Sequence, residues 1–91
     1  MDEIVKVRAA FVTDKESGDV TAVFDEKWET CNGIYNACYA HVGQHGPCSR
    51  EWVMEDCREA TPAEYAALLK ELVDYVGYDV EVVPVSSIKF Y

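Results

Sequence analysis

The stretch from Thr61 to Gly77 constrains the fold of this chain most strongly, because it specifies both ends of one helix. Thr61 suits the N-cap, Pro62 the first helical position and Glu64 the third, which together form a capping box. Apolar side chains then recur at helical spacing, and Gly77 favours a left-handed stop. The apolar positions are Tyr65, Leu68, Leu69, Leu72, Val73 and Val76, and the predicted solvent face is Glu64, Ala67, Glu71 and Asp74. The sequence therefore predicts an amphipathic helix that must cover another element.

Two segments before this helix alternate between apolar and polar residues, which is the pattern of half-buried strands. Residues 4–13 and 20–25 fit it, and the polar, glycine-containing segment 14–19 between them is typical of a hairpin connection. The side chains predicted to face the core are Val5, Val7, Ala9, Phe11, Val20, Ala22 and Phe24. We expect residues 25–33 to form a surface loop that ends in an Asn-Gly turn.

The remaining segments predict two further strands and a short helix. Residues 35–42 alternate like a strand, whereas the glycines and the proline of residues 43–47 argue against a regular element there. Ser49 suits the N-cap of a short helix that runs to about Cys57. Residues 79–83 alternate again and predict the last strand, whose end is confined to an edge or a bulge by the proline that follows.

The predicted order of elements is β-β-β-α-α-β within one domain that covers residues 1–91. We therefore expect an α+β fold, with a small, mostly antiparallel four-stranded sheet and the helices packed on one face. If the last strand lies beside the first, these two strands run parallel. Residues 85–91 are apolar enough to dock on the domain or on a partner.

Charge and length exclude several classes of protein. Seventeen acidic residues against eight basic ones give a formal net charge of −9, which repels nucleic-acid phosphates. No apolar run approaches the roughly 20 residues needed to span a membrane. The first residues do not resemble a secretion signal. We expect a cytoplasmic protein whose cysteines stay reduced, with neither nucleic acid nor membrane as partner.

The segment from Cys38 to Cys48 holds the side chains most able to do chemistry, because it contains both histidines and two of the four cysteines. Cys38, His41, His45 and Cys48 are all ligand types that zinc accepts, and each Cys–His pair has ligand-like spacing. Strand alternation, however, points Cys38 and His41 to opposite faces unless the chain turns between them. A small zinc-binding domain is therefore one hypothesis. The alternative is that Cys38 packs in the core and both histidines bond to loop backbone.

A thiol-dependent enzyme is a second hypothesis. Cys48 would precede a helix N-terminus, where the aligned N–H dipoles lower the pKa of a thiol. His45 lies three residues away and is a candidate base. No residue is nominated to orient the histidine or to stabilise an oxyanion, so we expect no enzymatic activity.

The hypothesis that we favour is a non-enzymatic protein that binds another protein through exposed aromatic side chains and the His-Gly loop. Six tyrosines and two tryptophans are many for 91 residues, and aromatic side chains left outside a core are common interface anchors. The alternative for Tyr39 and Trp52 is a place in the core. The acidic charge favours a basic partner, and a homodimer is the other arrangement considered. No cofactor is predicted. The candidate binding residues are Trp28, Tyr35, Tyr39, His41, Gln44 and His45.

Several short motifs resemble a group of uncharacterised bacterial proteins. They are Cys38-Tyr-Ala-His-Val-Gly-Gln-His45, Ala60-Thr-Pro-Ala-Glu-Tyr-Ala66, Leu69-Lys-Glu-Leu72 and Gly77-Tyr78. The group is found on mobile elements of gut bacteria, such as conjugative transposons and prophages, and the resemblance covers roughly residues 4–83. The resemblance assigns no functional site residues to this chain. It implies a bacterial, cytoplasmic, mobile-element setting, in which accessory proteins that interact with the host are common.

Overall fold

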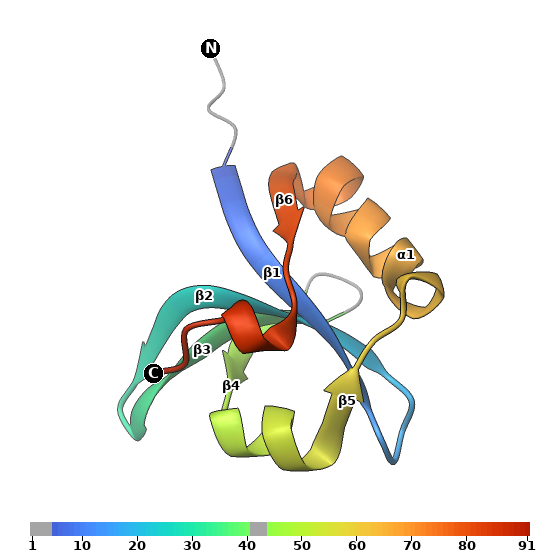
Figure 1. Ribbon diagram of the computed structural model, residues 1–91. Helices are drawn as coiled ribbons and strands as arrows, with labels where there is room; N and C mark the ends of the chain where they lie inside the picture. The colour runs from blue at the N-terminus through green and yellow to red at the C-terminus, as the bar shows by residue number, and fades with distance from the viewer. Residues whose placement is uncertain (1–4, 41–43) are drawn as a thin grey trace.

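The computed structural model describes residues 5–40 and 44–91, which form one twisted sheet with helices against it (Figure 1). The strands are β1 (Val5–Asp14), β2 (Val20–Thr30), β3 (Gly33–Ala40), β4 (Gln44–Cys48), β5 (Cys57–Glu59) and β6 (Tyr78–Val82). The helical segments are η1 (Trp52–Asp56), α1 (Pro62–Glu71), η2 (Leu72–Val76) and η3 (Val85–Ser87). The α+β class and the mostly antiparallel sheet are as predicted from the sequence.

Strand β1 is the centre of the sheet. The order is β4-β3-β2-β1-β5, and β6 also pairs with β1. On the edge of β1 away from β2, β6 runs parallel to residues 5–9 and β5 runs antiparallel to residues 12–14. The prediction that the last strand would run parallel to the first if the two were neighbours is therefore confirmed.

The predicted four strands are wrong in number, because residues 5–40 and 44–91 form a sheet of six strands. Strand β2 continues to Thr30, through residues predicted as a surface loop, and pairs with β3 across an irregular register after Val23. Strand β4 occupies residues predicted to be irregular. It tolerates Pro47 because it lies at the edge of the sheet, where a missing N–H breaks no second ladder.

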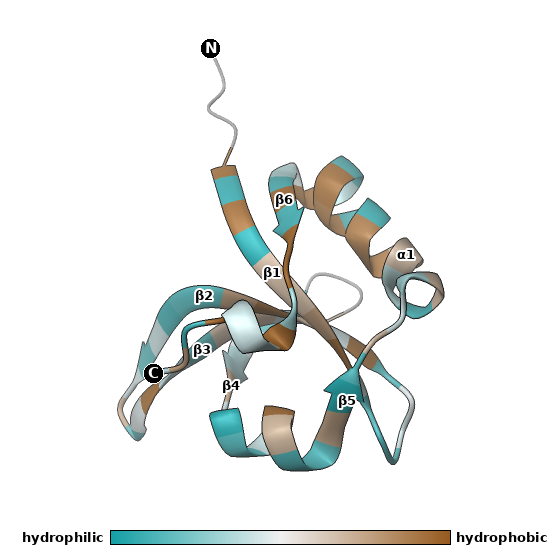
Figure 2. Cartoon of the chain, in the orientation of Figure 1, coloured by the Kyte–Doolittle hydropathy of each residue, from teal (hydrophilic) through white to brown (hydrophobic). Residues whose placement is uncertain are grey.

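The prediction that the helices share one face of the sheet is also wrong. Helix α1 and η2 pack on one face, and η1 packs with the C-terminal residues on the other. Figure 1 shows α1 and η1 on opposite sides of the strands. The cause lies in β1, where Ala9 and Phe11 face α1 while Ala10 and Val12 face η1, so that its second half is buried on both faces. The first half alternates between apolar and charged residues (Figure 2).

Helix α1 begins as predicted. The Thr61 side chain accepts from the Glu64 N–H, and the Glu64 carboxylate accepts from the Thr61 N–H. Gly77 ends the following turn with φ of 92°. Between them η2 is π-helical, which changes the phase of the helix. As a result Val73 is exposed, although it was predicted on the apolar face. Glu71, the last residue of α1, was predicted on the solvent face but accepts a hydrogen bond from the Tyr39 hydroxyl.

The residues after Pro84 dock on the domain itself, one of the two arrangements predicted. Ile88 is buried on the η1 face of the sheet. Asp25 accepts from the Lys89 N–H at 2.9 Å and also pairs with Arg8 at 2.6 Å. Glu59 accepts from the Val85 N–H at 2.7 Å.

In the described residues no helix is long and apolar enough to cross a membrane.

Candidate functional site

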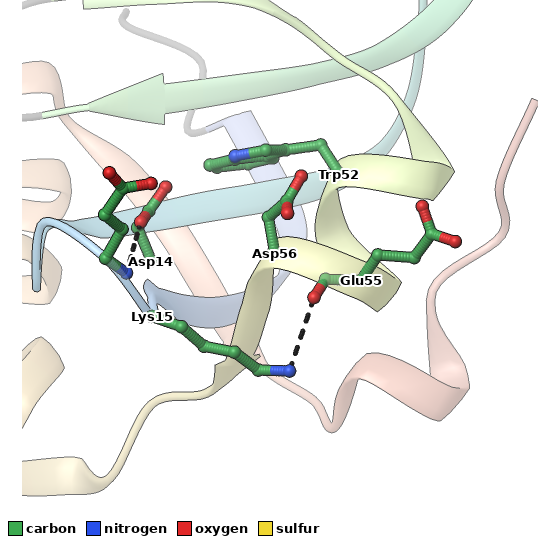
Figure 3. A pocket seen from close by; sticks show the side chains of 6 residues that line it. Asp14, Lys15, Trp52, Glu55 and Asp56 are labelled. Atoms are coloured by element: carbon green, nitrogen blue, oxygen red, sulfur yellow. Dashed lines mark hydrogen bonds between the residues drawn. The ribbon is translucent and has the colours of Figure 1, made fainter.

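A pocket of about 470 Å³ lies where the β1–β2 hairpin meets η1 (Figure 3). The hairpin supplies Asp14, Lys15 and Glu16, and η1 supplies Trp52, Glu55 and Asp56. The two segments are joined by the Lys15 N–H, which donates to the Asp56 carbonyl at 2.9 Å. Four carboxylates and one indole therefore surround a space that is open to solvent.

Local hydrogen bonds hold both walls of this pocket. The Asp14 carboxylate accepts from the backbone N–H groups of Glu16 and Ser17, at 2.8 and 3.0 Å, and so shapes the hairpin turn. On the other wall, the Ser49 hydroxyl accepts from the Trp52 N–H at 3.1 Å, which is the predicted cap of the short helix. The wall residues are thus placed by the turn and by the cap.

The electrostatics of the pocket are acidic. The backbone N–H donors of Ser17 and Glu16 lower the pKa of Asp14, with a smaller contribution from the Trp52 indole. The only ammonium group in the lining, that of Lys15, donates to the Glu55 carbonyl at 3.3 Å. Behind the pocket, burial raises the pKa of the Cys57 thiol to about 11, and the negative charges of Asp14 and Asp56 add to that effect.

This arrangement suits an organic cation better than a metal ion. In residues 5–40 and 44–91, no three His, Cys, Asp or Glu side chains are grouped closely enough to hold a metal. The pocket carboxylates surround a wide space and do not converge on one point. An ammonium or guanidinium group is larger, and it gains both from the surrounding negative charge and from the face of the Trp52 indole.

The predicted aromatic anchors mostly pack within the domain. Trp28 and Tyr35 are partners across β2 and β3, and Trp28 packs against the core under α1. Tyr39 is fully buried, so its predicted place in a binding surface is wrong and the core alternative holds. Gln44 and His45 are exposed on β4.

His45 is exposed but already has partners within the domain. Its ring meets the edge of Tyr39, and its Nε2 hydrogen-bonds with the Tyr78 hydroxyl at 3.1 Å. Both partners belong to the α1 side of the sheet. His41, predicted both as a binding residue and as a zinc ligand, lies outside the described residues.

The structure places His45 on the other side of the sheet from Cys38 and Cys48. His45 lies opposite Tyr39 in the β3–β4 ladder and shares its face. Cys38 and Cys48 belong to the cluster under η1. The described members of the zinc hypothesis are therefore not brought together, and neither are the Cys48 and His45 of the enzyme hypothesis.

The acidic pocket was missed by sequence reasoning. The sequence predicts the hairpin residues only as a connection, and Glu55 and Asp56 only as part of the short helix that runs to about Cys57. Nearly forty residues separate Lys15 from Glu55, and no local pattern indicates that they meet. Neither a family model, a curated protein nor a solved structure matches this chain.

Proposed function

We propose that this protein is a non-enzymatic accessory protein that binds a lysine- or arginine-rich surface of another protein through the pocket around Trp52. The observation that carries the proposal is the lining of that pocket, where four carboxylates surround the indole. The formal net charge of −9 supports it, because long-range attraction brings a basic partner to an acidic domain. The resemblance to proteins of bacterial mobile elements suggests a host protein as the partner.

The recognised group is a single basic side chain of the partner. A lysine or arginine that enters the pocket leaves its charged head among the carboxylates that line it, while its methylene stem lies along Trp52. The Lys15 ammonium points away from Trp52 and donates to the Glu55 carbonyl, and the four carboxylates of the lining outnumber its single positive charge (Figure 3). This proposal replaces the aromatic surface around Tyr39 as the binding site.

Tryptophan fluorescence tests the proposal. In a Trp28→Phe background, Trp52 is the only tryptophan. We expect a lysine- and arginine-rich decapeptide to change its emission with saturation. The double variant Glu16→Gln, Glu55→Gln should weaken binding about fivefold, since partly exposed charge pairs contribute modestly and are screened by salt.

The matched control removes the same charge elsewhere. Glu26→Gln with Asp74→Asn changes two exposed carboxylates outside the pocket and should alter affinity less than twofold. Equal weakening by both double variants would mean that the peptide follows net charge and not the pocket. No saturable response at low salt would also count against the proposal.

A further inference from the structure

Two cysteines from neighbouring strands lie in contact on the η1 side of the sheet. Cys38 lies opposite Gly46 in the β3–β4 ladder, and Cys48 lies opposite Asn36, so the two thiols are diagonal neighbours on one face. Cys38 packs against the apolar cluster that contains Cys48, which brings the two thiols within reach of each other. The pocket beside this pair adjoins the acidic pocket, with which it shares Trp52, but the inference drawn from the two thiols does not depend on the function proposed above.

The pair opens into a second, mostly apolar pocket of about 410 Å³. Its lining is Thr21, Tyr35, Cys38, Ala40, Pro47, Cys48, Ser49 and Trp52. Cys38 is half-buried, whereas Cys48 is only 7% exposed. A small molecule that enters from solvent therefore reaches the Cys38 sulfur first and finds Cys48 behind it.

The two thiols are chemically unequal. The hydrogen bond from Cys48 lowers the pKa of Cys38, and the Gly46 N–H has the same effect. The hydrogen bond to Cys38 raises the pKa of Cys48, and burial raises it further. Cys38 is also the more exposed of the two, so it is the sulfur that a disulfide from solvent reaches and that acts as the thiolate. The attacking sulfur is therefore Cys38 and not the Cys48 that the sequence favours.

The other two thiols differ from this pair. Cys31 is exposed at the tip of the β2–β3 hairpin, whereas Cys38 lies near the other end of the same ladder, opposite Val23. Cys57 is buried, and its pKa is raised to about 11 mainly by that burial. A thiol with so high a pKa is mostly protonated near neutral pH and attacks slowly.

We propose that Cys38 and Cys48 form a redox-active dithiol that reacts with small-molecule disulfides. The Cys38 thiolate attacks one sulfur of the disulfide, the S–S bond breaks, and one thiolate leaves. Cys48 then loses its proton to that thiolate and attacks the Cys38 sulfur, which releases the second thiolate. The protein loses two electrons and two protons and gains an internal disulfide, while the disulfide becomes two thiols.

Closing this bond requires the two strands to approach, because diagonal neighbours in a sheet start farther apart than the two cysteines of a disulfide. The chain permits that movement, since β4 is an edge strand of five residues and is paired on one side only. A Cβ added at Gly46 would meet nothing within 4 Å, which leaves room beside the pair.

The test uses oxidised glutathione and intact mass. The background variant Cys31→Ser, Cys57→Ala retains only the proposed pair. We expect its mass to fall by two hydrogen atoms and to be restored by dithiothreitol. With Cys48→Ala added, the product should be heavier by one glutathionyl group. With Cys38→Ala added instead, reaction should be at least tenfold slower, since Cys48 is only 7% exposed and lies out of reach of a disulfide in solvent.

Alkylation of the unaltered protein tests the proposal without any substitution, so misfolding of a variant cannot affect the result. Cleavage after Tyr39 separates the peptides of Cys38 and Cys48. Under limiting iodoacetamide, Cys38 should be modified at least tenfold faster than Cys48. Equal rates at the two cysteines, a mixed disulfide on Cys38 that persists while Cys48 is present, or disulfides formed only between molecules would each overturn the proposal.

Discussion

Asn36 joins three segments of the chain through one amide group. The side chain is 1% exposed, and its Nδ2 donates to the carbonyls of Phe24 and Lys89, each at 2.8 Å. Its Oδ1 accepts from the Tyr91 N–H at 3.1 Å. The amide therefore satisfies the backbone where the β2–β3 register shifts, and it ties the C-terminal residues to the sheet.

Replacing this side chain should be costly. Asn36→Ala leaves buried backbone groups without partners, and we expect it to lower the free energy of unfolding by about 3 kcal/mol. Urea denaturation measures that loss, and chymotrypsin should cleave the C-terminal residues faster. Ser86→Ala, an exposed change in the same segment, should have an effect below about 0.5 kcal/mol. If Asn36→Ala lowered the free energy of unfolding by less than about 0.5 kcal/mol, the role given to the Asn36 amide would be wrong.

At the scale of elements, one ion pair couples β5 to the start of α1. Arg58 donates from both terminal nitrogens to the two oxygens of Glu64, at 2.7 and 2.5 Å. The same carboxylate accepts from the Thr61 N–H in the capping box. These contacts lower the pKa of Glu64 from 4.5 to about 2, and the hydrogen bonds from Arg58 contribute most to that shift.

This shift predicts a pH dependence of stability. Because the pKa of Glu64 is lower in the folded state, its contribution is complete above pH 4.5 and is lost as the pH falls towards about 2. Glu64→Gln should therefore be less stable than the unaltered protein at pH 7, with the difference shrinking between pH 4.5 and 2. Urea unfolding at several pH values measures it. Glu26→Gln removes a carboxylate at an exposed position of β2 and controls for the loss of charge. If the stability difference between Glu64→Gln and the unaltered protein stayed constant across this pH range, the coupling would be refuted.

The whole molecule is one sheet between two apolar clusters. Leu72 belongs to the cluster under α1 and η2, and Ile88 to the cluster under η1. Strand β1 contributes alternate residues to both, so neither cluster keeps its shape if this strand leaves the sheet. We therefore expect the two faces to unfold together.

Core truncations on the two faces test this cooperativity. Leu72 is 0% and Ile88 6% exposed, so Leu72→Ala and Ile88→Ala should each cost about 3 kcal/mol. Both should shift a single transition that is the same by fluorescence and by circular dichroism. Tyr75→Ala, where the side chain is 80% exposed, should change stability by less than about 0.5 kcal/mol. Two separate transitions in either variant would show that the faces are independent.

Local sequence signals predicted the elements whose own residues include a cap, a terminating glycine or a regular alternation of apolar and polar side chains. The Thr61 cap and the Gly77 stop bounded the helix that follows β5, and strict alternation located β1 and the beginning of β2. The same logic failed at η2, because a π-helical turn shifts the phase that a regular helix assumes. It failed again for Gly46 and Pro47, which are permitted in β4 only by its place at the edge.

The sequence by itself determined the α+β class, the start of α1, the Gly77 stop after η2, the first hairpin and the acidic charge, because each depends on neighbouring residues or on composition. Tertiary structure alone decided that both faces of the sheet are covered, that Lys15 meets Glu55, and that Cys38 meets Cys48 while His45 lies on the other side. These meetings depend on strand order and register. Order and register are set by which apolar faces bury one another across the chain, and no local pattern encodes that choice.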